Sequence, residues 1–222
     1  VDSICIHWPD GTSQVQYGLT ANQHVMIDYE PNHPSKKEIA DYPIFHQSTL
    51  AQVVHTENDF DEFRRDRIVP FGLSKSGPSL AKGDLNKDGL EDLIMGGSLG
   101  FPVQVFMQNT DGTFTISSNT MTETIEKEST AVLTIDLDND GDLDLYIGNG
   151  SNEGWGITEQ LKDLVYTNNG NGQFTLARPF ATNILLATRC LVRVDFNNEG
   201  FQDILLGGGF LPAASGCTGR SR

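Results

Sequence analysis

The sequence is poor in basic residues and in long apolar runs, and each shortage excludes a class of protein. Only 15 of its 222 residues are Lys or Arg, against 30 Asp or Glu, which gives a formal net charge of -15. An acidic chain without a basic stretch lacks the contacts that phosphate backbones require, so we expect no nucleic-acid binding. No run of apolar residues approaches the length of about 18 that a transmembrane helix needs, so we expect no transmembrane segment.

Cysteine and histidine are also too sparse, or too scattered, to form a recognisable site. Cys5, Cys190 and Cys217 are odd in number and far apart, which predicts neither a zinc site nor a disulfide framework and leaves the redox compartment open. The five histidines have no spacing of the kind that binds a transition metal, and surface or structural roles are the simpler interpretation.

What the chain does contain is an acidic loop of nine residues that occurs three times, at residues 84–92, 136–144 and 195–203. Oxygen-bearing side chains at positions one, three and five converge when the backbone curls, and glycine at position six permits the sharp turn. Position seven then offers its carbonyl oxygen, and position nine adds a carboxylate. The candidate calcium ligands are the side chains of Asp84, Asn86, Asp88, Asp92, Asp136, Asp138, Asp140, Asp144, Asp195, Asn197, Glu199 and Asp203, and the carbonyls of Leu90, Asp142 and Phe201.

A simpler alternative for these loops is a plain β-turn, because Asp and Asn side chains also cap their own backbone. Three occurrences favour a cation, and 12 acids fall within the 27 loop residues. The pattern resembles the first half of an EF-hand, but position twelve holds Met95, Ile147 or Leu206 in place of the usual glutamate. The flanking residues also predict strands, where an EF-hand has helices.

The strand pattern predicts an all-β chain of β-propeller-type, four-stranded blades. Short apolar or alternating stretches lie before and after each loop, and strand, turn and strand follow at residues 103–114 and 164–174. The loops begin at 84, 136 and 195, a spacing of 52 and then 59 residues, and an insertion at residues 151–163 explains the longer interval. About two and a half blades are therefore present, and such a segment does not close a ring by itself.

We divide the chain into a small β module at residues 1–30, a linker at 31–78, the blades at 79–211 and an unstructured tail at 212–222. The turn Trp8-Pro-Asp-Gly-Thr12 is expected to join strands at residues 3–7 and 13–17. Within the linker, residues 42–54 have strand character, and residues 59–67 suit a helical turn or a loop. Because the chain begins with Val1, we expect it to derive from a longer precursor with a targeting signal.

These units resemble FG-GAP/VCBS repeats, the calcium-binding propeller blades of integrin alpha-chain heads and of many secreted bacterial proteins. Residues 1–12, with Asn22-Gln23 and residues 25–27, are similar to the ASPIC/UnbV module, and residues 55–80 resemble the junction found in surface proteins of Bacteroidetes-type bacteria. The resemblance implies Ca²⁺ as the cofactor, an extracellular or outer-membrane-associated location, and a protein or carbohydrate ligand at the cell surface.

We therefore expect a non-enzymatic, calcium-stabilised propeller segment that acts in binding or adhesion. The alternatives are a structural spacer and the propeller of a carbohydrate-active enzyme such as a polysaccharide lyase. The blades hold few and scattered bases for catalysis. Residues 96–100 fit the G-x-S-x-G pattern of serine hydrolases, but a strand-like segment follows where that elbow needs a helix. His55 and Glu57 form a possible acid/base pair, for which a structural junction is the simpler interpretation.

Overall fold

The computed structural model describes residues 3–29, 53–65, 67, 72, 74–75, 77–153, 158–177 and 185–209. The chain divides into two compact units, Val1–Ser48 and Thr49–Arg222. The predictions for residues 30–52, which include the start of the linker, and for the tail at 212–222 lie outside the described residues.

The first unit contains a β-hairpin whose strands match those expected from the sequence. Strands β1 (Ser3–His7) and β2 (Ser13–Tyr17) pair antiparallel, with Ser3 opposite Tyr17. The turn between them is closed by a hydrogen bond of 2.9 Å from the Trp8 amide to the Thr12 carbonyl. Asp10 Oδ1 accepts a bond of 3.0 Å from the Thr12 amide, which is the backbone cap that Asp commonly makes in turns.

The second unit is built from strands, with 3₁₀ turns at η1 (Glu62–Arg64), η2 (Thr122–Thr124) and η3 (Glu159–Leu161). Within the described ranges, no helix has the length and apolar character to cross a membrane. The strands are β3 (Leu80–Gly83), β4 (Asp92–Met95), β5 (Gln104–Gln108), β6 (Phe114–Ile116), β7 (Ser129–Ile135), β8 (Asp144–Asn149), β9 (Leu164–Asn168), β10 (Phe174–Leu176), β11 (Thr188–Val194) and β12 (Asp203–Gly208).

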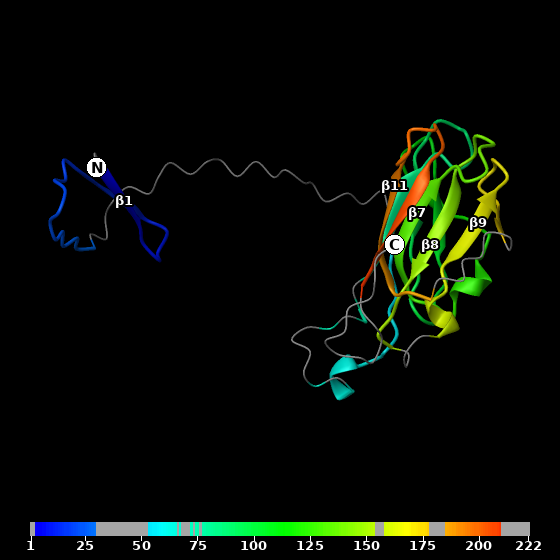
Figure 1. Ribbon diagram of the computed structural model, residues 1–222, viewed down its shortest axis with the longest axis horizontal. Coiled ribbons are helices and arrows are strands. Elements are labelled where there is room, and N and C mark those ends of the chain that lie inside the picture. Colours follow the sequence, from blue (N-terminus) through cyan, green and yellow to red (C-terminus); the bar gives the residue numbers. More distant parts are fainter. Residues whose placement is uncertain are drawn as a thin grey trace. The chain divides into compact units, whose positions relative to one another are not determined.

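These strands form three consecutive sheets, each an antiparallel meander in chain order. Sheet 1 has the order β3-β4-β5-β6, sheet 2 has β7-β8-β9-β10, and sheet 3 pairs β11 with β12. Figure 1 shows β7, β8 and β9 side by side in sheet 2. The all-β prediction and its blade-like, four-stranded units are confirmed, and the third unit is observed as two strands among the described residues.

Sheets 1 and 2 pack face to face around a shared hydrophobic core. Strand β4 contributes Ile94 and β5 contributes Val105, while β8 contributes Leu145 and Ile147. Because side chains alternate between the two faces of a strand, Leu145 and Ile147 point toward sheet 1 and Tyr146 points the other way. Full burial of each large aliphatic side chain contributes about 1.5 to 3 kcal/mol, so this core is a main source of stability.

Sheet 2 packs against sheet 3 through its second face. Tyr146 and Val165 of sheet 2 join Leu206 of sheet 3 in a separate cluster, with Leu191 and Ile204 packed against it. The first strands of neighbouring sheets also contact one another, β3 with β7 and β7 with β11. Sheet 2 thus covers one face of sheet 1, and sheet 3 covers the other face of sheet 2, which is the arrangement expected of stacked blades.

One close approach between sheets 2 and 3 requires a glycine. A Cβ atom added to Gly148 of β8 would lie 2.5 Å from Cγ2 of Thr188 in β11. At such a distance one of the two strands has to shift, because interiors are close-packed. Gly148 therefore sets how tightly the two sheets approach each other.

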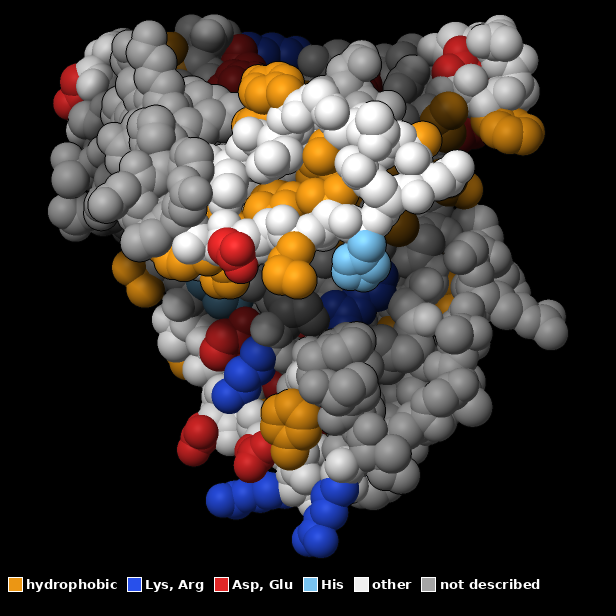
Figure 2. Space-filling model, turned by 90° about the vertical axis from the view of Figure 1, so that its left-hand side faces the viewer, with side chains coloured by type: hydrophobic (Ala, Val, Ile, Leu, Met, Phe, Trp, Pro, Cys, Tyr) orange, Lys and Arg blue, Asp and Glu red, His pale blue; other side chains and the backbone are white. Residues whose placement is uncertain are grey.

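Some hydrophobic side chains remain at the surface, among them Phe196, Val192 and Leu205 of the third repeat. Figure 2 shows one face, on which hydrophobic side chains reach the surface among acidic and basic ones.

Candidate metal-binding loops

The three acidic loops connect β3 to β4, β7 to β8 and β11 to β12, as hairpin connections within their sheets. Their backbones have the same conformation. Position four has a positive φ in every copy, 60° at Lys87, 62° at Asn139 and 56° at Asn198, and the glycine at position six has φ near 86° to 89°. The left-handed region suits Gly and is tolerated by Asn, so the sequence pattern favours this curl.

The carboxylate at position one closes each loop by accepting backbone hydrogen bonds. Asp136 Oδ1 accepts from the Asp140 amide at 3.2 Å, and its Oδ2 accepts from the Gly141 amide at 3.0 Å. Asp84 and Asp195 make the equivalent bonds in their own loops. Each carboxylate oxygen has two lone pairs, so these bonds leave capacity for a cation.

The carboxylate at position nine lies beneath the loop and ties it to the sheet. Asp144 Oδ2 accepts from the Leu137 amide at 2.9 Å, and its Oδ1 accepts from the Asn168 amide of β9 at 2.8 Å. Asp144 is fully buried, and burial raises its pKa, although the two backbone bonds oppose that shift. Asp92 makes the same pair of bonds in the first loop, and burial likewise raises its pKa.

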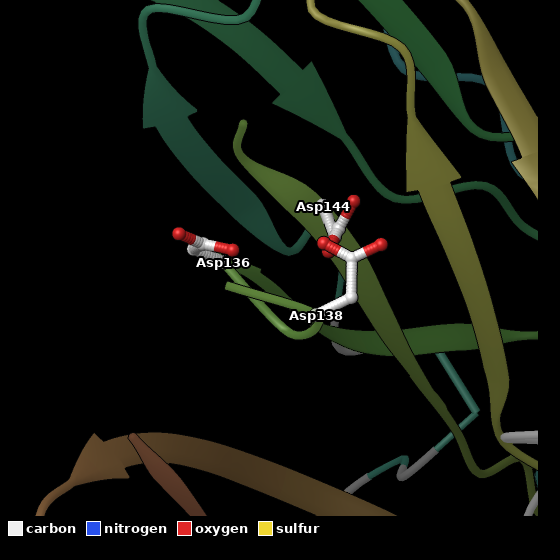
Figure 3. A group of neighbouring side chains, drawn as sticks. All are labelled: Asp136, Asp138 and Asp144. Carbon is white, nitrogen blue, oxygen red and sulfur yellow. The ribbon is translucent and has the colours of Figure 1, made fainter. Parts of the chain in front are cut away.

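Three carboxylates converge in the middle loop. Asp136, Asp138 and Asp144 each place one oxygen atom so that all three lie within 4.8 Å of one another. Figure 3 shows the carboxylates of Asp138 and Asp144 next to each other, with one oxygen of Asp136 turned toward them. Positions one, three and nine of the predicted ligand set are therefore brought together.

The other predicted ligands of the middle loop have different neighbours. Asp140 Oδ1 accepts a bond of 2.8 Å from the amide of Asp142, which fixes the turn around position five. The Asp142 side chain forms an ion pair with Lys87 of the first loop. That ion pair raises the pKa of Lys87 and joins two successive repeats. The spacing of residues within one loop does not indicate a contact with the loop of a neighbouring repeat, so this ion pair was not predictable from the sequence.

In the first and third loops, position three is an asparagine that takes part in the turn. Asn86 Oδ1 accepts from the Asp88 amide, and Asn197 Oδ1 accepts from the Glu199 amide, both at 3.2 Å. Leu90 and Phe201, whose carbonyl oxygens are predicted ligands, occupy position seven of their loops. The predicted ligand Asp203, at position nine, accepts a hydrogen bond of 3.0 Å from the Phe196 amide. These loops carry one negative charge fewer than the middle loop at the four side-chain positions.

Other candidate residues lie outside the loops. Ser98 is buried, and its hydroxyl donates to the Thr56 carbonyl at 2.6 Å. His55 Nε2 lies 2.7 Å from Glu57 Oε1, in a partly buried pair. Cys5 and Cys190 are free thiols at exposed positions.

One known family matches a part of the chain that contains the first two loops. The family described as the FG-GAP-like repeat matches residues 84–147, which run from the first acidic loop through the middle loop into β8. A comparison with curated proteins found no match. Residues 84–147 therefore contain an FG-GAP-like repeat.

Proposed function

We propose that the three acidic loops bind calcium, and that the chain is a non-enzymatic, calcium-stabilised propeller segment of an exported bacterial surface protein that acts in binding or adhesion. The observation that carries the calcium proposal is the convergence of Asp136, Asp138 and Asp144 within 4.8 Å. The repetition of the same backbone curl in all three loops supports extending it to the first and third copies.

The chemistry of the donors favours calcium among the common cations. Every candidate ligand is a carboxylate, amide or carbonyl oxygen, and hard cations prefer such ligands, whereas zinc and copper prefer nitrogen or sulfur. Calcium takes 6 to 8 oxygens at roughly 2.3 to 2.6 Å in flexible geometry, and magnesium demands a tighter octahedron. A surface loop with carboxylates at alternate positions suits the flexible ion better.

A bound cation would act on stability first. In the middle loop the carboxylates repel one another, and the hydrogen bonds from the Asp140, Gly141 and Leu137 amides offset only part of that repulsion. A divalent ion neutralises the cluster and joins the two ends of the hairpin, so its binding free energy adds to the folding free energy. The proposed role is a rigid link between neighbouring strands.

The surface location and the adhesive role are supported by resemblance. Residues 84–147 contain the FG-GAP-like repeat, and the turn at Trp8-Pro-Asp-Gly-Thr12 lies in the part that is similar to the ASPIC/UnbV module. On this proposal, residues 1–30 form an accessory β module, and the blades bind a protein or carbohydrate ligand at the cell surface.

Thermal melts test the calcium proposal directly. The chain is unfolded in EDTA, in excess magnesium and in excess calcium, at equal ionic strength. Calcium should raise the melting temperature, by an amount that grows with its concentration, and magnesium should raise it less. Identical melting temperatures in the three conditions would contradict the proposal.

The non-enzymatic part of the proposal is supported by the partners of the lysines. Lys82 pairs with Glu91 at 2.7 Å, Lys162 lies 4.0 Å from Glu159, and Lys87 pairs with Asp142. In these three pairs the lysine charge already faces an acid, so on this proposal none of the three binds a substrate carboxylate or removes a proton. Incubation with acidic polysaccharides, with and without calcium, should yield no product; a product lost on changing one of these lysines to alanine would favour a lyase.

A further inference from the structure

The middle loop carries more acids than either of its neighbours. At positions one, three, five, seven and nine it has only aspartate, at residues 136, 138, 140, 142 and 144. The first and third loops have an asparagine at position three, and Leu90 and Phe201 at position seven. Five acids therefore lie at these positions in the middle loop, and three in each of the others, so the middle loop has the strongest repulsion to offset.

The additional acid at position seven, Asp142, is enclosed by the protein. Its exposed fraction is 9%. One side of the carboxylate is covered by the β9–β10 turn, where a Cβ atom added to Gly170 would lie 2.7 Å from Asp142 Oδ2. Because burying an unpaired charge is costly, this carboxylate requires a partner of the opposite sign.

That partner is a lysine from a different repeat. Lys87, at position four of the first loop, forms an ion pair with Asp142. Its ammonium nitrogen would lie 3.9 Å from a Cβ atom added to Gly141, so it is next to the sharp turn of the middle loop. The bond with Asp142 raises the pKa of Lys87, and the charges of Asp140 and Asp136 add to that shift. The ammonium group is therefore in the electrostatic field of two proposed calcium ligands.

Contacts between the two repeats keep Lys87 within reach of the middle loop. The Leu85 carbonyl, two residues before Lys87, accepts a hydrogen bond of 2.8 Å from the Asn168 side chain and one of 3.0 Å from the Gly172 amide. Both donors belong to the β9–β10 hairpin of sheet 2. The first loop is thus attached to the sheet that carries the middle loop.

We propose that Lys87 is a built-in counter-ion of the middle loop: its ammonium group stabilises the acidic loop when no divalent cation is bound, and lowers the affinity of that loop for calcium. The second part rests on the proposed function, because it requires calcium at the middle loop, whereas the first part does not. The ammonium group repels an approaching divalent cation and also neutralises Asp142, whose charge would otherwise attract it. The first repeat thereby lowers the calcium affinity of the second.

Calcium titrations of the whole chain, followed by NMR, test the second part loop by loop. The amides of Gly89, Gly141 and Gly200 each donate to the position-one carboxylate of their own loop, so each resonance reports one loop. Lys87→Gln should lower the calcium concentration that half-saturates the Gly141 resonance by roughly three- to tenfold. The Gly200 resonance should titrate as before. Lys87→Arg keeps the charge and should titrate like the unaltered chain.

The three glycines also distinguish failure of this inference from failure of the proposed function. If no loop of the unaltered chain responds to calcium, the proposed function is wrong, and the calcium part of the present proposal with it. If Gly141 responds at the same calcium concentration in Lys87→Gln and in the unaltered chain, calcium binds but Lys87 does not affect it. A gain in affinity at Gly89 as large as that at Gly141 would mean that the lysine acts on its own loop, which would also overturn the proposal.

Melting in EDTA tests the counter-ion role in the absence of calcium. Lys87→Gln leaves Asp142 among the other acids of its loop without a partner, so this variant should melt at a lower temperature than the unaltered chain. The difference should shrink as sodium chloride is added, because salt screens the repulsion. Equal melting temperatures at low salt would overturn the counter-ion role.

Two further variants keep the result interpretable. Lys162→Gln removes the same charge just before β9, whose first residue, Leu164, pairs with Ile147, and the middle loop joins the opposite end of β8. This control should leave the Gly141 titration unchanged. The Lys87 side chain is 56% exposed, so Lys87→Gln should fold. If it does not, Lys87→Asn replaces it with the same expected titration, since asparagine occupies position four in the other two loops.

Discussion

The side-chain amide of Asn168, in β9 of sheet 2, donates a hydrogen bond of 2.8 Å to the carbonyl oxygen of Leu85 in the acidic loop of sheet 1. The same amide donates to the Leu143 carbonyl in the middle loop at 3.1 Å. Asn168 is buried, and its backbone amide also donates to Asp144, so one residue connects two loops and the position-nine carboxylate. The acidic loops are therefore joined across repeats and are not independent surface turns.

Asn168→Ala should destabilise the second unit. The substitution leaves the Leu85 carbonyl with the Gly172 amide as its remaining described donor, and removes a donor from the Leu143 carbonyl. Loss of buried hydrogen bonds of this kind costs on the order of 1 to 3 kcal/mol. Chemical denaturation measures the loss, and Asn171→Ala, an exposed change in the same β9–β10 turn, is the matched control. Equal unfolding free energies for the two variants would contradict the role of Asn168.

Gly148→Ala should also destabilise the chain, by a different mechanism. Its new Cβ would meet Thr188 Cγ2 at 2.5 Å, and overpacking of this kind costs roughly 1 to 3 kcal/mol. Thr188→Ser removes that methyl group and keeps the hydroxyl that donates to Asp163 Oδ2 at 2.8 Å. The double variant should therefore recover part of the lost stability.

A double-mutant cycle with these three variants measures the coupling between Gly148 and Thr188. A favourable coupling energy is expected, because the Thr188 methyl group that the new Cβ would meet is absent from the double variant. Strictly additive effects would show that any cost of Gly148→Ala does not arise from contact with the Thr188 methyl group.

The sequence predicted the elements of the blades because each strand alternates and each loop carries its own turn residues. Strands β1 and β2 agree with the predicted 3–7 and 13–17, and strands lie before and after each acidic loop, as predicted. The loop curl was also predictable, since Gly141 and Asn139 occupy the two positions with positive φ. These are local properties, determined by residues close together in the chain.

The contacts between repeats were not predictable from such patterns. Lys87 pairs with Asp142, and Asp163 accepts a hydrogen bond from Thr188, and both contacts depend on how the sheets stack. The burial of acidic residues such as Glu128 was not predictable either, because the residue type alone does not indicate whether a carboxyl group is buried or solvated. These contacts depend on how neighbouring sheets are aligned against one another. The alternation of side chains within a strand does not specify that alignment.

Glu128→Gln should remove a pH dependence of stability. Burial, together with the nearby Glu57 carboxylate, raises the pKa of Glu128 from 4.5 to about 8. A carboxyl group with a raised pKa in the folded state holds its proton there more tightly than in the unfolded chain. Its contribution to stability is therefore full below pH 4.5, falls as the pH rises toward 8, and is lost above that value.

The amide of glutamine has no charge to bury, so the variant should be more stable than the unaltered chain at pH 9, by on the order of 2 to 4 kcal/mol. Near pH 5 the two proteins should unfold at similar denaturant concentrations, since Gln retains an oxygen to accept the Leu99 amide bond. Glu126→Gln, an exposed neighbour, should keep the original pH profile. Parallel stability profiles for Glu128→Gln and the unaltered chain would argue against a buried, protonated Glu128.

The substitution Asp138→Asn tests whether the Asp138 carboxylate binds a cation or only stabilises the fold of the loop. Asp138 is exposed, and its carboxylate converges with those of Asp136 and Asp144, which both bind backbone amides of the loop. The substitution removes one charge from the cluster and leaves those amide bonds in place. In EDTA the variant should therefore be as stable as the unaltered chain, or slightly more stable, within about 0.5 kcal/mol.

With calcium present the order should reverse, because fewer charged ligands weaken the ion's affinity. We expect a smaller rise in melting temperature and a requirement for on the order of tenfold more calcium to reach half of the full effect. Asp59→Asn, which removes an exposed acid from the segment before the blades, should leave the calcium response unchanged. If Asp138→Asn lowered stability equally with and without calcium, the converging carboxylates would be a structural turn and the middle loop would not be a cation site.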